Sequence, residues 1–157
     1  MPDERQMYFE DVDVGSKIPE REFGPHTLVK AVAWAGVQEN PGALHFDRDY
    51  VREFRGAHTI VASGALRQSY LTRMITDWAG PRGFLKKMSV RHTTSTYEGD
   101  MQRYAGTVIE KSTDPDHPWI VCELDGRNQD GQEIIRGRCT VALPRRDWPP
   151  DRPTWGA

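Results

Sequence analysis

The sequence lacks a long apolar segment, a strong charge of either sign and a leader-like start. No run of apolar residues approaches the roughly 20 that a bilayer-spanning helix needs. Residues 1–5 do not show the basic-then-apolar order of a signal peptide. The 21 basic and 23 acidic residues give a formal net charge of −2, which provides no general attraction to nucleic acid or to an anionic membrane. We therefore expect a cytoplasmic protein that binds neither nucleic acid nor a membrane.

Internal repeats and low-complexity segments are also missing. At 157 residues, with 37% hydrophobic and 28% charged residues, the chain has the size and balance of one domain with a buried core. We expect a single domain over residues 1–157 that ends in a proline-rich tail, residues 145–157. Because proline is excluded from the interior of a sheet, this tail is expected to be loosely packed. The alternative is that its tryptophans cover the surface of a partner.

Cysteine is scarce. The chain has two, Cys122 and Cys139, which are too few for a disulfide framework at this length, and their spacing matches no zinc pattern. If Asp130-Gly131 forms a two-residue hairpin turn, residues at equal distances on either side face each other, and the two cysteines are such a pair. We expect neighbouring, reduced thiols that pack in the core. The sequence implies no metal site and no cofactor.

Two segments show helical patterns. Across residues 63–79, apolar residues recur at helical spacing and form one broad stripe. The stripe consists of Leu66, Tyr70, Leu71, Met74, Ile75 and Trp78. Ser63 is expected to cap the first turn, and Gly80-Pro81 ends the helix. Residues 28–37 predict a second helix, which Thr27 caps.

After Pro81 the hydrophobic period changes from that of a helix to that of a strand. Four segments rich in β-branched and aromatic residues are separated by turn residues. These segments are residues 84–97, 101–112, 118–128 and 133–143. In the last one, alternate residues from Ile135 to Leu143 share a core face, and those from Ile134 to Thr140 share a wetter face. The pattern predicts a four-strand antiparallel meander around the long helix, an α+β arrangement.

One irregular segment gathers polar, proton-handling side chains. It runs from Gln38 to Asp47, after the helix predicted over residues 28–37, and it contains His45. Irregular segments carry function more often than regular ones. An imidazole can take a proton from water near neutral pH, so the sequence indicates a candidate site around His45. Asp47 is expected to cap a short helix that follows.

Asn40-Pro41 followed by His45-Phe46-Asp47 resembles the hydratase motif of the MaoC-like, (R)-specific enoyl-CoA hydratases. In those enzymes an aspartate stands where this chain has Asn40. If the residues after Pro41 contain a short insertion, the aspartate position falls on Gln38 instead. In both alignments the carboxylate is missing, and Glu39 is the only local substitute.

Other segments follow the same order as in that family. Residues 8–15 are similar to its N-terminal lead-in and residues 97–100 to its Gly-Asp turn between strands. Residues 73–81 are similar to the end of the central helix in the small MaoC-like subunit of the actinobacterial steroid side-chain hydratase. The resemblance covers about residues 8–144, and this range is the expected core of the domain.

The resemblance implies a hot-dog fold, in which a bent antiparallel sheet wraps around a central helix. It also implies an additional strand near residues 18–27 and a short helix near residues 48–55. Hot-dog domains usually pair to extend their sheet, and MaoC-like enzymes bind acyl-CoA near the protomer interface. We therefore expect a homodimer or higher oligomer, or a hetero-oligomer with another MaoC-like chain.

The function that the resemblance implies is hydration of an enoyl-CoA thioester or dehydration of the 3-hydroxyacyl-CoA. His45 would act as base, with Asn40 or Glu39 positioning the water. The backbone N–H of Gly64, after Ser63, would stabilise the thioester oxyanion. The missing aspartate motivates an alternative, a non-catalytic acyl-CoA-binding subunit that pairs with an active MaoC-like chain. A hot-dog thioesterase is a third, weaker possibility.

The remaining histidines and four basic residues near the predicted strand after Pro81 are expected to have structural or surface positions. Surface or packing positions are expected for His26, His58, His92 and His117. A solvated strand edge is expected for Arg82, Lys86, Lys87 and Arg91, and the alternative is contact with CoA phosphates.

Overall fold

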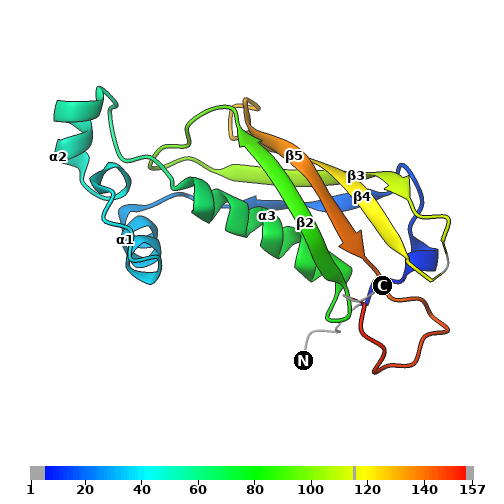
Figure 1. The fold of residues 1–157 in the computed structure, drawn as a ribbon. Coiled ribbons are helices and arrows are strands. Elements are labelled where there is room, and N and C mark those ends of the chain that lie inside the picture. Colours follow the sequence, from blue (N-terminus) through cyan, green and yellow to red (C-terminus); the bar gives the residue numbers. More distant parts are fainter. Residues whose placement is uncertain (1–5, 115, 155–157) are drawn as a thin grey trace.

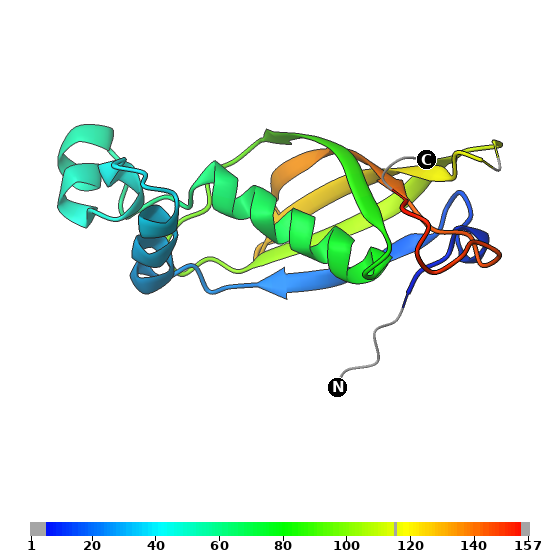
Figure 2. The same ribbon diagram turned by 60° about the horizontal axis from the view of Figure 1, so that its bottom comes forward.

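A computed structural model describes residues 6–114 and 116–154 and shows one long helix that lies against a five-stranded antiparallel sheet (Figure 1). The strands are β1 (Lys17–Phe23), β2 (Phe84–His92), β3 (Gln102–Lys111), β4 (Trp119–Asn128) and β5 (Glu133–Ala142). The helices are α1 (Leu28–Val37), α2 (Arg48–Tyr50) and α3 (Gly64–Ala79), with a π-helical turn at Val51–Arg55 and 3-10 turns at Phe9–Asp11 and Ala43–His45. Figure 2 shows the sheet curving around α3. This α+β arrangement confirms the predicted hot-dog fold.

The strand order is β1-β3-β4-β5-β2. Strands β3, β4 and β5 form a meander, but β2 pairs with β5 at the far edge and not with β3, which follows it along the chain. The predicted four-strand meander is therefore wrong at its first member, and β2 ends at His92, earlier than expected. Hydrophobic alternation identifies a strand but carries no information about which strand lies beside it. Strands β1 and β2 are left as the two edges of the sheet.

The apolar stripe of α3 fills the space between the helix and the sheet. Leu71, Met74 and Ile75 are at most 1% exposed and pack in one cluster with the inner face of the sheet, which confirms the predicted stripe. Burial of each such side chain contributes about 1.5–3 kcal/mol to folding. Ser63 occupies the N-cap position but its side chain makes no capping hydrogen bond, so that expected cap is wrong. Gly80 ends the helix with a φ of 81°.

The β4–β5 hairpin brings Cys122 opposite Cys139, and both thiols are buried and unbridged as predicted. The turn is longer than expected. The Asn128 N–H donates to the Gln132 carbonyl at 3.0 Å, and Gly131 adopts a φ of 78°, which is typical of a three-residue hairpin loop with a left-handed residue. A register shift near the end of β4 absorbs the extra residue, so the cysteines still face each other.

The described part of the tail, up to residue 154, packs against the end of the sheet that lies away from α1, in contrast to the loose packing expected. Trp148 is 7% exposed, and the Arg152 guanidinium lies 3.8 Å from the centre of its ring. Arg82 donates to the Pro149 carbonyl at 2.9 Å. The proline-rich composition forbids a strand, but it does not prevent contacts of this kind. Trp155 lies outside the described residues.

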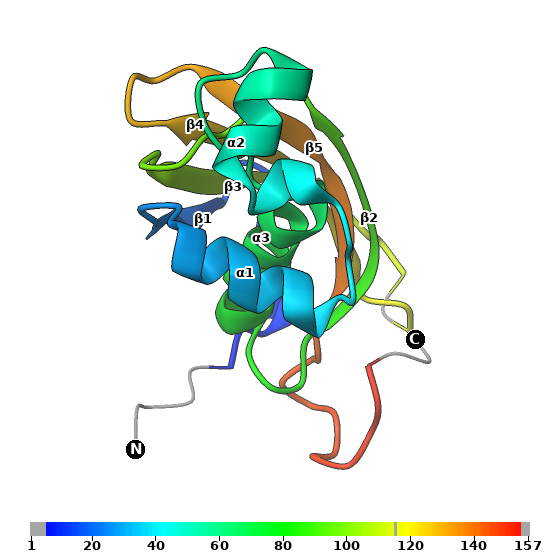
Figure 3. The ribbon, with the colours of Figure 1, turned by 90° about the vertical axis from the view of Figure 1, so that its left-hand side faces the viewer.

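A helical lobe projects beyond the opposite end of the sheet, where α1 and α2 lie in front of α3 (Figure 3). Thr27 caps α1 and Asp47 caps α2 through side-chain oxygens, both as predicted. The lobe has its own small core, made by Ala31, Val51 and Ile60. In the part of the chain that the structure describes, no helix combines the length and apolar composition needed to cross a bilayer.

Candidate functional site

The end of α1 determines where Asn40 lies. The Glu39 N–H donates to the Gly36 carbonyl and the Asn40 N–H to the Ala35 carbonyl, at 3.3 and 3.0 Å, which is the Schellman pattern of helix ends. Glu39 occupies the left-handed position of this motif with a φ of 50°. Its side chain is exposed and lines a shallow apolar pocket with Val32. Asn40 lies between that pocket and a second, enclosed cavity that Glu39 does not line.

A 3-10 turn after Pro41 carries His45. The Asn40 Oδ1 accepts a hydrogen bond from the Gly42 N–H at 2.9 Å, which orients the amide at the start of this turn. His45 Nδ1 lies 2.8 Å from the Val61 carbonyl oxygen. Because a carbonyl only accepts, Nδ1 carries the hydrogen in the neutral ring and Nε2 keeps a free lone pair. His45 is therefore arranged as a base.

The enclosed cavity joins the residues of the candidate site. It is lined by His26, Ala31, Trp34, Ala35, Asn40, His45, Ser63 and Leu66. Its solvent-accessible volume of about 10 Å³ is close to the room that one water molecule needs. Asn40, His45 and Ser63 therefore line one cavity, and Glu39 lies outside it.

The cavity abuts the N-terminal end of α3. The first backbone N–H groups of a helix have no intrahelical acceptor and carry the positive end of the helix dipole, and Gly64 supplies one of them. The open side of Gly64 faces His92 on β2, because a Cβ built on this glycine would lie 3.1 Å from His92 Nε2. Burial and the nearby positive charge of Arg67 lower the pKa of His92. His92 therefore borders the expected oxyanion position, a role that the sequence did not indicate.

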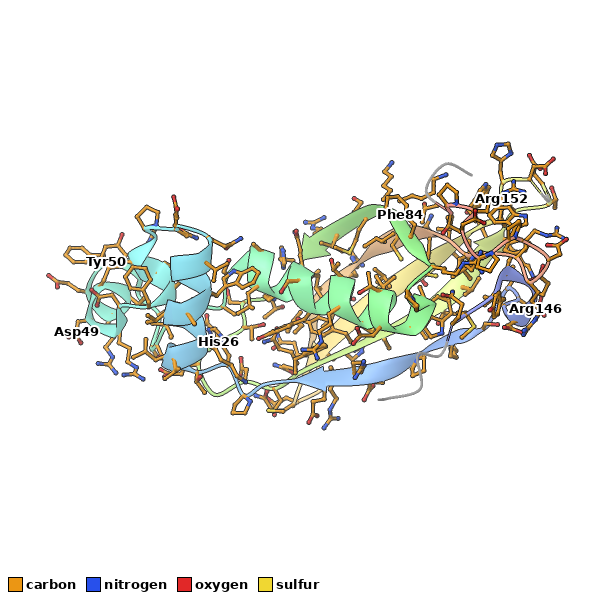
Figure 4. All side chains as sticks on the ribbon, turned by 90° about the horizontal axis from the view of Figure 1, so that it is seen from below. His26, Asp49, Tyr50, Phe84, Arg146 and Arg152 are labelled. Carbon is orange, nitrogen blue, oxygen red and sulfur yellow. The ribbon has the colours of Figure 1, made fainter. Side chains whose placement is uncertain are left out.

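His26 also lines the cavity, whereas the sequence assigned it only a surface or packing position. It is 1% exposed, and neither ring nitrogen has a hydrogen-bond partner among the described residues. Burial, partly opposed by the charge of Glu98, lowers the pKa of His26 from 6.5. No spacing in the sequence connects His26 to His45, because the loop between β1 and α1 meets the Ala43–His45 turn only in the folded chain. Figure 4 shows His26 where the lobe joins the sheet.

A buried polar cluster lies beneath the first turns of α3. Arg67 is 3% exposed and donates to the carbonyl of Ile134, a residue that was expected on the wetter face of β5 but is fully buried. Burial lowers the pKa of Arg67. Tyr104 donates to the Gln102 side chain at 2.6 Å, also in the interior. Arg67 sits inside the apolar stripe of the sequence, so no periodicity indicated this cluster.

The carboxylate of Glu98, in the loop between β2 and β3, joins this loop to the lobe. Arg48 Nε donates to Glu98 Oε2 at 2.8 Å, and the Thr59 hydroxyl donates to the same oxygen at 2.8 Å. These two donors, Arg48 first, lower the pKa of Glu98 from 4.5 to about 2. The cluster fixes the start of α2 close to the residues that lead into the cavity.

The other candidates lie outside the cavity. His117 pairs with Asp114 at 2.9 Å on the surface, and the ring of His58 lies against Tyr97. The basic residues of β2 are on the exposed edge strand. Within residues 6–114 and 116–154, no cluster of three or more histidine, cysteine or acidic side chains could hold a metal ion.

Comparisons with known proteins place this geometry in context. No protein-family model matches the chain. The chain is 28% identical over 135 residues to the 3-oxo-4,17-pregnadiene-20-carboxyl-CoA hydratase beta subunit of Mycobacterium tuberculosis, covering 85% of this chain and 97% of that protein. The crystal structure of the ChsH1–ChsH2 complex from the same organism matches 83% of this chain and 98% of its own with a TM-score of 0.74 and 24% identity.

Two further structures share the fold. The unliganded (R)-hydratase PhaJ1 from Pseudomonas aeruginosa has a TM-score of 0.78 and 19% identity, over 94% of this chain and 96% of its own. The MaoC-like dehydratase from Rhodospirillum rubrum has a TM-score of 0.76 and 22% identity, over 90% and 99% of the two chains. The similarity extends over nearly the full length of each of these proteins.

Proposed function

We propose that this chain, which is similar to MaoC-like hot-dog hydratases, adds water to an enoyl-CoA thioester or removes water from the 3-hydroxyacyl-CoA. One observation carries the proposal. His45, with Nδ1 held by the Val61 carbonyl, lines a water-sized cavity that reaches the N-terminal end of α3. The reaction requires a base, a water molecule and hydrogen-bond donors for the oxyanion. This cavity combines a base, room for one water molecule and free backbone donors.

His45 performs the proton transfers in this proposal. Its free Nε2 takes a proton from the water while the water oxygen bonds to C3 of the enoyl group. The electrons of the C2–C3 double bond move toward the thioester carbonyl, and the resulting enolate is protonated at C2 by the imidazolium. The base is returned to its starting state, and one water molecule has been added. Dehydration follows the same steps in reverse.

The start of α3 stabilises the charge that develops on the thioester oxygen. The N–H of Gly64 is one of the free donors at this helix end, and the helix dipole favours negative charge there. Ser63, which lines the cavity, places this end beside His45. Fixed donors aimed at a developing oxyanion supply a large part of many enzymatic rate accelerations.

Asn40 orients the water in this scheme. Its amide oxygen accepts from the Gly42 N–H, so its NH₂ group is the part that remains available to hold an oxygen atom. An amide cannot exchange a proton at neutral pH, and all proton transfer therefore falls to His45. We expect slower turnover than a carboxylate at the same position would support.

The alternative function is that of an acyl-CoA-binding subunit that works with a second MaoC-like chain. The amide at position 40 favours it, as does the similarity to a hydratase beta subunit and to a chain of a two-protein complex. The enclosed cavity, at about 10 Å³, is too small for an acyl group. The substrate therefore has to approach along a surface that a second chain, identical or different, completes.

The deciding experiment is an assay of the purified chain with trans-2-enoyl-CoA thioesters of several acyl sizes. Hydration by the chain alone, followed as loss of the enoyl-thioester absorbance, supports the enzyme. Hydration only after addition of a second MaoC-like chain supports the subunit. Release of free CoA from a saturated acyl-CoA, without hydration, would instead identify a thioesterase and contradict both.

A further inference from the structure

His26 is held rigidly but its ring is unpaired. The His26 N–H donates to the Asp100 carbonyl at 2.9 Å, and its own carbonyl accepts from the Gly99 N–H at 2.8 Å. The side chain is 1% exposed, yet neither ring nitrogen has a partner among the residues described. Buried polar groups of this kind are almost always satisfied by protein or by ordered water, so the ring needs a partner other than the described residues.

The space next to the ring fits such a partner. The cavity of about 10 Å³ is lined by His26, His45 and Trp34, and the indole Nε1 of Trp34 is likewise buried without a partner among the described residues. A buried water molecule typically makes about three hydrogen bonds. Three nitrogen-bearing rings around room for one water match that requirement.

The hydrogen-bonding capacities of the three rings are complementary to water. The indole N–H of Trp34 only donates, and the free Nε2 of His45 only accepts. His26 supplies one donor and one acceptor while it is neutral, and burial favours its neutral form. One water molecule can accept from Trp34, donate to His45 and make its third bond to His26.

We propose that His26 is a water-positioning residue of the site, and that it helps to hold the reacting water for His45. The catalytic role of this water rests on the proposed function. The presence of the water in the cavity does not depend on that function. The proposal adds His26 to the water-positioning role that the proposed function gives to Asn40, which lines the same cavity.

The charged groups around His26 do not offer it another partner. The groups that act on its ring are Glu98, Lys30, His45 and Asp100. Glu98 is engaged by Arg48 and Thr59, and the Lys30 ammonium donates to the carbonyl of Gly24 at 3.1 Å. The Asp100 carboxylate accepts from the Tyr97 N–H and from Gln129. A molecule in the cavity is therefore the partner that remains for the His26 ring nitrogens.

The direct test is a high-resolution crystal structure of the unliganded protein and of His26→Leu. We expect one water molecule within hydrogen-bond distance of His26 and His45 in the wild type, and its loss in the variant. A dry cavity in the wild type would overturn the proposal, as would an unchanged water in His26→Leu. Because this readout needs no turnover, it separates the failure of this inference from the failure of the proposed function.

The catalytic consequence is measured in the assay in which the protein is active, alone or with a second chain. His26→Leu should lower kcat roughly tenfold with KM little changed, about the effect of losing one hydrogen bond to the water. His26→Gln keeps a donor and an acceptor and should restore most of kcat, which a purely structural role of the imidazole would not predict. His117→Leu, at a surface histidine, is the matched control and should not alter kcat. Equal kcat in wild type and in a folded His26→Leu would contradict the proposal.

Discussion

His45 Nδ1 and the Val61 carbonyl oxygen lie 2.8 Å apart and join two segments that are separated by 16 residues in the chain. The Val61 N–H in turn donates to the Leu44 carbonyl at 3.2 Å. This pair of hydrogen bonds fastens the turn that carries the proposed base to the segment that leads into α3. The base and the helix end that would bind the thioester oxygen are therefore held in a fixed relation.

His45→Ala should lower hydration by about 100-fold or more, because general acid–base catalysis typically contributes that much. The measurement is kcat/KM on an enoyl-CoA substrate, with circular dichroism to show that the fold is retained. His117→Ala provides a control at an exposed histidine outside the cavity. Turnover that survives in folded His45→Ala would place the chemistry elsewhere.

Asn40→Asp should raise turnover, because it places a titratable carboxyl where the hydratase motif that this segment resembles has an aspartate. The Gly42 N–H that now bonds to the amide oxygen would support the ionised form. Glu39→Gln is the informative companion: its side chain is exposed and outside the cavity, so we expect turnover to be retained. A large loss in Glu39→Gln would instead assign the carboxylate's role to Glu39.

Glu39→Gly should stabilise the protein by about 1 kcal/mol, because a non-glycine residue in the left-handed region costs about 1–2 kcal/mol. Glu39 has a φ of 50°. The unfolding free energy from urea titration measures the effect. Gln38→Gly, one residue earlier with a φ of −88°, is the matched control and should not be stabilising, since glycine relieves no strain there.

The stability of the protein should fall as the pH drops from about 4.5 toward 2. The Glu98 carboxylate has its pKa lowered from 4.5 to about 2 in the folded protein, chiefly by Arg48. A lowered folded-state pKa stabilises the fold above the unfolded-state value, and this contribution is lost as the carboxylate is protonated. Urea denaturation of the wild type and of Glu98→Gln at several pH values should show a difference that shrinks over this window. Arg48→Gln should reduce the same pH dependence, and an unchanged profile in both variants would refute the assignment.

The chain should form a dimer or a larger assembly, because α1 exposes apolar side chains and the sheet has two edges. Lys30 is the one charged residue among the ten of α1, and none of the other nine carries an amide or hydroxyl side chain. Val29 and Val37 on this apolar helix are nevertheless 78% and 80% exposed. Light scattering at micromolar concentration should report more than one chain per particle. Val29→Lys with Val37→Lys should shift the population toward monomer, whereas Val14→Lys, at a 62% exposed valine before β1, should not.

Local patterns in the sequence were sufficient for the two longer helices and for the existence of four of the strands. The stripe of α3, the caps at Thr27 and Asp47, and the pairing of the cysteines follow from the spacing of residues near each other in the chain. The candidate base His45 was identified in the same way, from the irregular segment and the family motif around it. Side-chain periodicity and backbone capping act over a few residues, and a sequence displays them directly.

Only the tertiary structure determined which strands pair and which residues surround His45. The pairing of β2 with β5 depends on contacts between segments far apart in the chain, and so does the position of His26 beside His45. The way α1 ends, with Glu39 in a left-handed conformation, leaves the Glu39 side chain exposed and outside the cavity. The contacts of Trp148 determine how the tail packs. The sequence by itself determined which elements form and which residue is the candidate base, because those depend on local interactions. The neighbours of that base were determined by long-range packing, which brings the loop after β1, α1 and the start of α3 around one cavity.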